Sequence, residues 1–562
     1  MPPLPAALRF ILQAQADLLR HLPAVLVEQR WFGGKARRIR GVRLLDAVPL
    51  TKHPRAYLLL LQVRYTSGPP EQYLLPLCCV SALRQDSAVP SKVPHPVVAS
   101  LTVGDREMIC FDGIHDREAQ EQLLALVTRS RQVRGLSGTI VGKRGRALSR
   151  VLSEHSEADL LRDGRVIGKE QSNTALLYGN ALFFKIFRKL EEGIQPDIEV
   201  VRFLSEKTPY RHIPQFAGSI EYRRGGHRPV AIAVVQEFVP NRGDGWGYAL
   251  RLVTRYFDRV CSLPVRRETR PPAPSSPLDV AQTGRLPLPR QLIGRDALKM
   301  ATLLGTRTGE LHLALASDRR DPAFAPAPCS EAYQRVLVRE QFARAAATFR
   351  LLRNSLRQLP AAVKKEAEAT LCLRHDYLAR IRRIGAGRLA AVRIRCHGDY
   401  HLGQILYTGN DFIIIDFEGE PAKPLRARRE KHPPFRDAAG MMRSFHYAAY
   451  AGLFGRGKNG RSTLALRSWA DAWYVTMAGV FLRAYLNALS GSPLLPSDPA
   501  VTALLLETFL VEKALYEVAY ELNNRPSWLP IPLTGIRQMI GQPTVASARP
   551  ARPRVAKSPS AR

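Results

Sequence analysis

Two neighbouring segments carry the residue types that phosphoryl transfer requires. Asp399 and Gln404 lie in residues 396–404, and Asp416 follows the apolar run 411–415. In phosphoryl transfer a carboxylate orients the attacking hydroxyl group, and Mg²⁺ neutralises the charge of the phosphates. We therefore predict that Asp399 is the catalytic base. Because Mg²⁺ prefers oxygen ligands, we predict that Gln404 and Asp416 bind this ion.

A structural interpretation of the same residues is also open. The run His-Gly-Asp at 397–399 could form a turn, and Asp416 could cap the end of a strand. The catalytic interpretation is favoured because it explains the types and the order of all three side chains together.

A lysine on an apolar strand adds a candidate phosphate ligand. Lys185 lies within the run 181–187, which reads as a buried strand, and a lysine there is costly unless it is paired or functional. We predict that Lys185 binds the phosphates of ATP and that Glu199, on the following helix, orients it. The alternative is an edge-strand lysine that extends its amine to water.

The remaining ATP contacts are predicted by position. We expect residues 171–179 to form a loop over the phosphates, although a Gly-x-Gly-x-x-Gly pattern is absent. Ser172, Asn173 and Thr174 would donate hydrogen bonds there. Gln236 and Phe238 follow an apolar strand at the point where a kinase hinge would meet adenine through backbone groups.

Apolar periodicity and turn residues divide the chain into parts. We predict a β-rich module opened by a helix over residues 1–90, and a lobe of strands and helices over 91–240. A mainly helical lobe is expected over 241–542. A Pro-, Arg- and Ser-rich insertion at about 264–290 and a basic tail at 543–562 are expected to be disordered.

Composition indicates a soluble globular protein. The chain has 562 residues, of which 45% are hydrophobic and 23% charged, and no run of apolar residues is long enough to cross a membrane. The N-terminus lacks the features of a signal peptide. The seven cysteines show no metal-ligand spacing and no disulfide framework, so we expect a reducing cytoplasm.

The formal net charge of +34 suggests attraction to polyanions and steering of an anionic substrate such as ATP. However, the basic residues are mostly arginines spread along the whole chain, and no nucleic-acid-binding motif stands out. We therefore expect no specific nucleic-acid partner.

The sequence resembles the maltokinase family, a branch of the aminoglycoside-phosphotransferase-like kinases. The segments that carry this resemblance are 29–35, 170–174, 184–188, 196–200, 397–404, 416–421, 436–445, 512–517 and 524–533. They follow the order of the family's motifs over about residues 5 to 540. The insertion, the tail and Tyr400, where the family often has leucine, are departures from its pattern.

The resemblance implies an α+β, bilobal, protein-kinase-like fold with a β-rich N-terminal cap and a helical C-terminal lobe. It implies ATP- and Mg²⁺-dependent phosphorylation of maltose to maltose 1-phosphate, which feeds α-glucan and glycogen synthesis from trehalose. In this family the kinase is often fused to trehalose synthase. This chain has no room for that enzyme, so it would act alone or in a complex with it.

Candidate sugar-binding residues lie near the catalytic loop and on a C-terminal helix. They are His401, Glu418, Arg436, Asp437, Lys513, Tyr516, Tyr520 and Glu521. The last four share one helix face by the i, i+3, i+4 rule, although such a face could also pack on a neighbouring helix. The mixed charge near residue 513 leans towards a neutral sugar. A kinase of glucosamine or another amino sugar, and a non-catalytic partner module of trehalose synthase, remain as alternatives.

Overall fold

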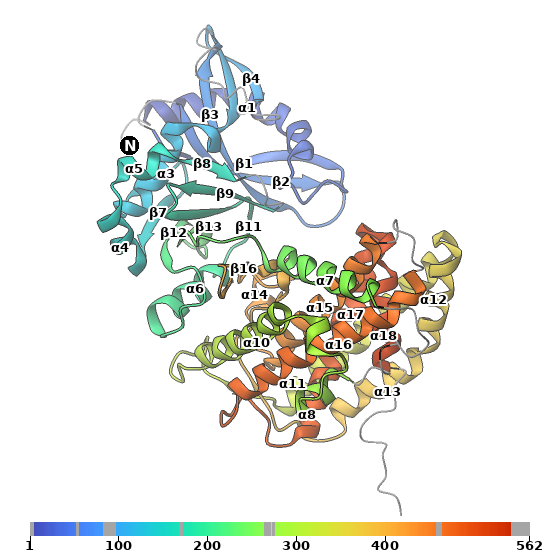
Figure 1. Cartoon of the computed structure of the whole chain (residues 1–562). Helices are drawn as coiled ribbons and strands as arrows, with labels where there is room; N and C mark the ends of the chain where they lie inside the picture. The colour runs from blue at the N-terminus through green and yellow to red at the C-terminus, as the bar shows by residue number, and fades with distance from the viewer. Residues whose placement is uncertain are drawn as a thin grey trace, which may run out of the picture. The chain divides into compact units, whose positions relative to one another are not determined.

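The computed structural model describes residues 5–51, 55–82, 97–167, 172–263, 271, 276–456 and 463–540. The chain forms two compact units, which we call the first unit (residues 1–242 and 406–430) and the second unit (243–405 and 431–562). Strands dominate the first unit and helices the second, as the blue-to-green and green-to-red segments of Figure 1 show.

The first unit opens with helix α1 (Ala6–Glu28), which packs on an antiparallel sheet. The strand order of this sheet is β1 (Ile39–Pro49), β2 (Ala56–Tyr65), β3 (Glu71–Ser81), β5 (Arg106–Asp112) and β4 (Val97–Val103), with β11 (Lys189–Leu190) also paired to β3. This helix and these strands form the β-rich module, opened by a helix, that was predicted at the N-terminus. The sheet continues to Asp112, so it extends past the predicted module boundary at residue 90.

Strand β2 is buried on both faces, which explains its nearly continuous apolar sequence. Because side chains alternate along a strand, Leu59 and Leu61 join the core beneath α1. Leu58 and Leu60 point the other way, into the core that contains helix α3 (Arg117–Thr128).

Cys79 on β3 and Cys110 on β5 face each other directly across the sheet and form a disulfide bond. The prediction that no cysteines pair was wrong here, because the two residues are 31 positions apart and only the sheet register brings them together.

A second sheet of the first unit carries the predicted ATP-binding residues. Its strand order is β6 (Gln132–Arg134), β7 (Thr139–Arg144), β12 (Phe216–Arg223), β13 (Val230–Glu237), β10 (Leu182–Phe187), β9 (Asn173–Tyr178) and β8 (Arg165–Ile167). The other elements of the unit are η2 (Gly113–His115), α4 (Arg146–Glu154), α5 (Glu157–Arg162), α6 (Pro196–Lys207), β17 (Phe412–Ile414) and α14 (Leu425–Arg428). Strand β17 lies in the apolar run 411–415 and pairs with β16 (Ile405–Tyr407) in a hairpin.

The second unit is mainly helical, as predicted. Its helices are α7 (Gly245–Cys261), α8 (Pro277–Thr283), α9 (Arg290–Ile293), α10 (Arg295–Leu315), α11 (Glu331–Ser355), α12 (Ala361–Cys372), α13 (Arg374–Gly385), α15 (Phe435–Gly455), α16 (Thr463–Ala488), α17 (Pro499–Asn524) and α18 (Pro530–Ile540). Short 3-10 turns and the strand pair β14 (Ala327–Pro328) and β15 (Val392–Arg393) connect them. Gly305 lets α10 approach α16 closely, because a Cβ atom there would lie 2.2 Å from the carbonyl oxygen of Phe481.

The predicted disorder at about 264–290 was wrong for its second half. Ser276 and Asp279 form a capping box that opens α8, and Arg290–Ile293 forms α9. The sequence signal was misleading because proline also favours the first turn of a helix. Residues 264–270 and 272–275, and the predicted tail at 543–562, lie outside the described residues.

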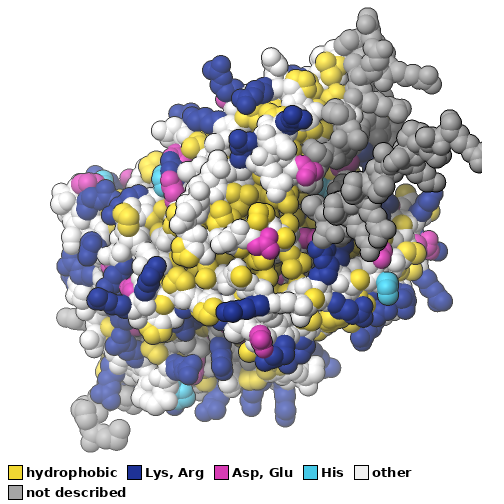
Figure 2. Space-filling view, turned by 90° about the horizontal axis from the view of Figure 1, so that it is seen from below, with side chains coloured by type: hydrophobic (Ala, Val, Ile, Leu, Met, Phe, Trp, Pro, Cys, Tyr) yellow, Lys and Arg dark blue, Asp and Glu magenta, His cyan; other side chains and the backbone are white. Residues whose placement is uncertain are grey.

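No helix in the described part of the chain is long and apolar enough to cross a membrane. Figure 2 shows Lys and Arg side chains scattered over the face in view, with hydrophobic side chains between them. This face carries no continuous basic stripe, which agrees with the even spread of arginines in the sequence.

Candidate active site

A buried carboxylate holds the catalytic loop of the second unit. Asp437, at the start of α15, accepts the N–H groups of His397 at 2.7 Å and Gly398 at 3.0 Å. Gly398 has a φ of 87°, a left-handed conformation that glycine adopts without strain. Asp437 is 2% exposed, and His312 Nε2 lies 3.2 Å from its Oδ2, the oxygen that also accepts from the N–H of His397.

Asp437 therefore positions the loop, and the prediction that it contacts the sugar is corrected. Burial raises the pKa of Asp437, but the hydrogen bond from His312, the charges of His312 and His397 and the N–H of Gly398 hold it below its ordinary value. The carboxylate stays ionised and keeps accepting from the loop backbone.

Asp399, the predicted base, pairs with a lysine on α17. Lys513 Nζ lies 3.0 Å from Asp399 Oδ1, and His401 Nε2 lies 3.8 Å from Asp399 Oδ2. Burial raises the pKa of Asp399, but the charges of Lys513 and His401 outweigh it and hold the pKa below its ordinary value. An ionised carboxylate can accept a hydroxyl proton, so the geometry suits a general base.

Lys513, Tyr516 and Tyr520 lie along one face of α17, as predicted. The Lys513 amine lies 4.9 Å from the ring centre of Tyr516, and the rings of Tyr516 and Tyr520 stack at 6.3 Å. Tyr520 is 44% exposed, so this face is not fully packed on a neighbouring helix. Two stacked rings beside Asp399 offer an aromatic surface of the kind that sugars contact.

Each glutamate of α17 is paired with a cation. The closest pairs are Glu507 with Arg380, Glu512 with Arg436 at 2.7 Å, Glu517 with Arg443 at 2.7 Å, and Glu521 with Arg525 at 2.8 Å. Glu521 is also 1% exposed and accepts from the hydroxyl of Tyr447. The prediction that Glu521 contacts the sugar is therefore corrected, because its carboxylate is buried and already bound to Arg525 and Tyr447. The contact of Arg436 with the sugar stays a prediction.

His401 and Gln404 belong to the turn that follows Asp399. His401 Nδ1 accepts the N–H of Gly403 at 3.1 Å, and the N–H of Gln404 donates to the carbonyl of His401 at 2.9 Å. This turn is the 3-10 helix η5 (Leu402–Gln404). The role of the Gln404 side chain in metal binding stays a prediction.

In the first unit, Lys185 is the centre of an acidic cluster. Its amine, on a side chain only 6% exposed, lies 3.0 Å from Asp197, 2.6 Å from Glu418 and in contact with Asp416. Asp197 also accepts the N–H of Phe417 at 3.0 Å, and Asn173 donates to Glu418 at 2.7 Å. Strand β10, helix α6 and the segment after β17 thus meet at one lysine.

The cluster has the donor set of a divalent metal site. Oxygen atoms of Asp197, Asp416 and Glu418 lie within 4.8 Å of one another. Burial raises the pKa of Glu418, and the carboxylates of Asp416 and Asp197 raise it further, against the opposing charge of Lys185. Lys185 alone does not neutralise these three carboxylates, and Arg428, 4.0 Å from Glu418, is shared with Glu191 at 2.9 Å. A Mg²⁺ ion would relieve the remaining negative charge.

The structure corrects several predictions in this region. Asp197, and not Glu199, pairs with Lys185, whereas Glu199 binds Arg429 at 2.9 Å. Glu418 belongs to the lysine cluster, so its predicted contact with sugar is replaced by this role. Asp197 was not among the predicted site residues, and Glu418 was predicted only to contact the sugar. Nothing in the types of these residues indicated which carboxylate would face the lysine.

The predicted phosphate loop is mostly a strand. Asn173 and Thr174 lie on β9, and the hydroxyl of Thr174 accepts a hydrogen bond from Arg188 at 2.7 Å. Ser172 is exposed just before the strand.

At the predicted hinge, Gln236 is buried on β13 and the N–H of Phe238 donates to the carbonyl of Ala181 at 2.8 Å. That N–H is therefore not available to adenine.

Comparison with known proteins agrees with this architecture. Residues 26–116 match the family model of the maltokinase N-terminal cap domain. A glucosamine kinase from Mycolicibacterium smegmatis is 26% identical over 388 residues, which are 68% of this chain and 81% of that protein. A glucosamine kinase from Streptacidiphilus jiangxiensis is 25% identical over 384 residues, which are 68% of this chain and 74% of that protein.

Solved structures show the fold. A glucosamine kinase in complex with glucosamine, ADP and inorganic phosphate superposes with a TM-score of 0.56 at 18% identity, covering 93% of this chain and 98% of the other. A second crystal form of glucosamine kinase gives a TM-score of 0.57 at 20% identity, covering 95% and 99%. The predicted α+β, kinase-like fold and the resemblance to the maltokinase family at the N-terminal cap are confirmed.

Proposed function

We propose that this protein is an ATP-dependent sugar kinase. The observation that carries the proposal is Asp399, which is held ionised beside Lys513 in a loop anchored by Asp437. Asp399 would accept the proton of the sugar hydroxyl as the hydroxyl oxygen attacks the γ-phosphorus of ATP. The transferred phosphoryl group then ends on the sugar, and ADP leaves.

The residues of the first unit would bind the nucleotide. Lys185 would bind its phosphates, with Asp197 orienting the amine, and Asp416 would hold Mg²⁺ with Glu418 as a further oxygen ligand. When bound, Mg²⁺ supplies positive charge to the phosphates. The exposed Ser172 is available for a further contact with ATP.

Maltose is the acceptor that we propose, with maltose 1-phosphate as the product. A neutral disaccharide needs hydroxyl partners and an aromatic surface, and Lys513, Tyr516, Tyr520 and His401 offer both. An amino sugar is cationic and needs an unpaired carboxylate. The glutamates of α17 are paired, and the Lys513 cation lies at the base itself, so this surface favours a neutral sugar.

The match of residues 26–116 to the maltokinase N-terminal cap domain supports maltose as the acceptor. In this proposal the product feeds glycogen and other α-glucans, starting from trehalose. The chain would work in the cytoplasm, alone or in a complex with trehalose synthase.

Glucosamine is the second candidate acceptor, because glucosamine kinases are among its relatives. An ADP-release assay with maltose, glucose, glucosamine and trehalose separates the two. We expect the highest kcat/KM with maltose. A higher value with glucosamine would refute maltose as the acceptor, and no ADP release above the Asp399→Asn background with any of these sugars would refute the kinase proposal for them.

A further inference from the structure

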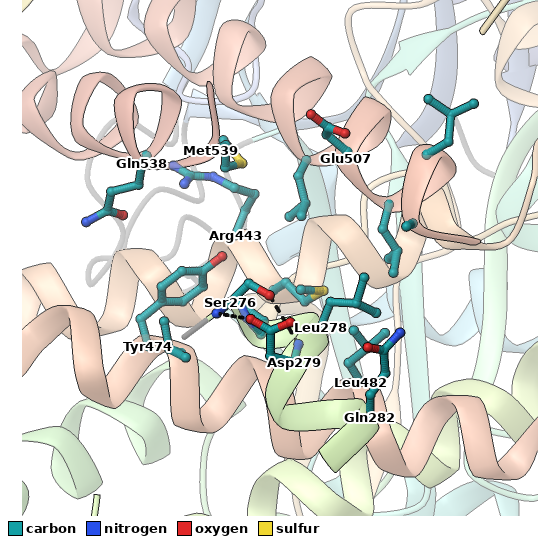
Figure 3. Close-up of a pocket in the computed structure, with 18 of the residues that line it drawn as sticks. Ser276, Leu278, Asp279, Gln282, Arg443, Tyr474, Leu482, Glu507, Gln538 and Met539 are labelled. Carbon is teal, nitrogen blue, oxygen red and sulfur yellow. Dashed lines mark hydrogen bonds between the residues drawn. The ribbon is translucent and has the colours of Figure 1, made fainter. Parts of the chain in front are cut away.

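The second unit contains a cavity of about 410 Å³ that none of the proposed catalytic side chains lines. It lies among α8, α13, α15, α16, α17 and α18 (Figure 3). Its volume falls within the range of roughly 300–1,000 Å³ that is usual for small-molecule sites. The cavity is therefore large enough for an organic ligand.

The cavity walls are mainly apolar. They include Leu278 from α8, Val475 and Leu482 from α16, Leu504 from α17 and Met539 from α18. A hydrocarbon chain in this space would leave water for apolar contacts, which is favourable in proportion to the area buried.

Polar side chains also line the cavity. Figure 3 shows Arg443, Tyr474 and Gln538 at one side, and Ser276, Asp279 and Gln282 near Leu278 and Leu482. Asp471 also lines the cavity; burial raises its pKa, and the hydroxyl of Tyr450 donates a hydrogen bond to it. Arg443 is neutralised by Glu517 at 2.7 Å, and burial raises the pKa of Tyr474 to about 12, so its phenol is neutral. An anionic group would find no charge to balance it here.

Arg383 on α13 is the cation of the lining that lacks a close carboxylate partner. Besides Asp471, which accepts from the hydroxyl of Tyr450, the lining contains Asp279, which accepts from the backbone of Ser276. The side chain of Arg383 is 39% exposed, but its Nη1 atom is buried and makes no hydrogen bond within the described residues. The nearest carboxylate oxygen, on Glu507, is 3.7 Å from Nη1, which is too far for a hydrogen bond. Glu507 also pairs with Arg380, so two arginines share one carboxylate.

We propose that this cavity binds an amphipathic carboxylate, with its hydrocarbon chain between α16 and α17 and its carboxylate on Arg383. The carboxylate would accept from the buried Nη1 and balance the second arginine, while the exposed part of Arg383 keeps the head group near water. The ligand class is thus a medium-chain fatty acid or a molecule of the same form.

Isothermal titration of the full-length protein with octanoate tests the proposal, with octylamine as a probe of equal length and opposite charge. We expect octanoate to bind and octylamine to bind at least about tenfold more weakly, because Arg383 repels an ammonium group. Absence of octanoate binding, or equal binding of octanoate and octylamine, would overturn the proposal that the cavity binds an amphipathic carboxylate.

Two variants and a control locate the binding. Arg383→Met should weaken octanoate binding about tenfold or more. Arg382→Met should leave binding unchanged, because Arg382 is exposed, does not line the cavity and lies 6.0 Å from the ring centre of Phe342. Ala503→Phe should abolish binding by filling the space.

Thermal unfolding of each variant shows that it is folded before titration. The site would be wrong if Arg383→Met bound octanoate as tightly as the unaltered protein. Full binding to folded Ala503→Phe would also place the ligand elsewhere.

Discussion

Replacing Lys513 by methionine tests how the proposed base is kept ionised. Coulomb's law with an effective dielectric constant of about 20 gives about 5.5 kcal/mol for unit charges 3.0 Å apart, before desolvation and side-chain entropy are subtracted. The net effect of such a partner is usually a pKa lower by about one to three units, or about 1.4–4 kcal/mol. Burial of Asp399 acts in the opposite direction and remains in the variant.

The direction in which the acid limb of kcat/KM moves follows from the protonation state that Asp399 needs. The base works only when it is deprotonated, and Lys513 holds the pKa of Asp399 below its ordinary value. Without the lysine the pKa rises, so activity is lost at a higher pH than in the unaltered enzyme. We expect the acid limb of kcat/KM to move up by about one to three pH units.

The assay is ADP release with maltose, measured as kcat/KM from about pH 2 to pH 8, a range that includes pH values below the ordinary pKa of an aspartate; kcat/KM reports the pKa values of the free enzyme. Lys513→Arg is the matched control, because it retains the charge and should leave the acid limb nearly in place. If the methionine variant moved the limb by less than about half a unit, the lysine would not be the group that keeps the base ionised. If both variants moved it equally, a change of shape and not of charge would be responsible.

Three further outcomes follow from the site. Asp399→Asn should keep ATP binding, measured by titration, but lower kcat by about 10²–10⁴-fold because the amide accepts no proton; retention of more than about a tenth of the rate would contradict the base assignment. Asp416→Ala should raise the Mg²⁺ concentration needed for half-maximal rate, and an unchanged Mg²⁺ titration would exclude this carboxylate as a ligand. Asp197→Asn should raise the KM for ATP and lower the free energy of unfolding by about 1–3 kcal/mol, because it weakens the buried pairing with Lys185. Glu199→Gln is its control and should change the KM for ATP much less; the reverse order would restore Glu199 as the partner of the lysine.

Much of the site could be predicted because local sequence determines it. The order of Asp399, Gln404 and Asp416, with Lys185 on an apolar strand, needs only residue types and strand periodicity. The face shared by Lys513, Tyr516 and Tyr520 follows from helical spacing, and the structure has it. Strands β2 and β3 were similarly visible as apolar runs between turns.

The pairing of charges could not be predicted in this way. Asp197 and Glu199 lie two positions apart on α6, so they point about 200° apart around the helix axis. Which of them faces Lys185 depends on how α6 docks on the sheet, and the docked helix turns Asp197 inward and leaves Glu199 to Arg429.

The difference between local sequence and long-range packing also explains the other features that could or could not be predicted. The sequence alone determined the types of residue in the site, the strands and helices that carry them, and the resemblance to a kinase family. Only the tertiary structure decided that Asp437 binds the loop backbone, that the glutamates of α17 are paired, and that Cys79 meets Cys110. These contacts join residues far apart in the chain, and their geometry depends on packing and sheet register, which residue types do not encode locally.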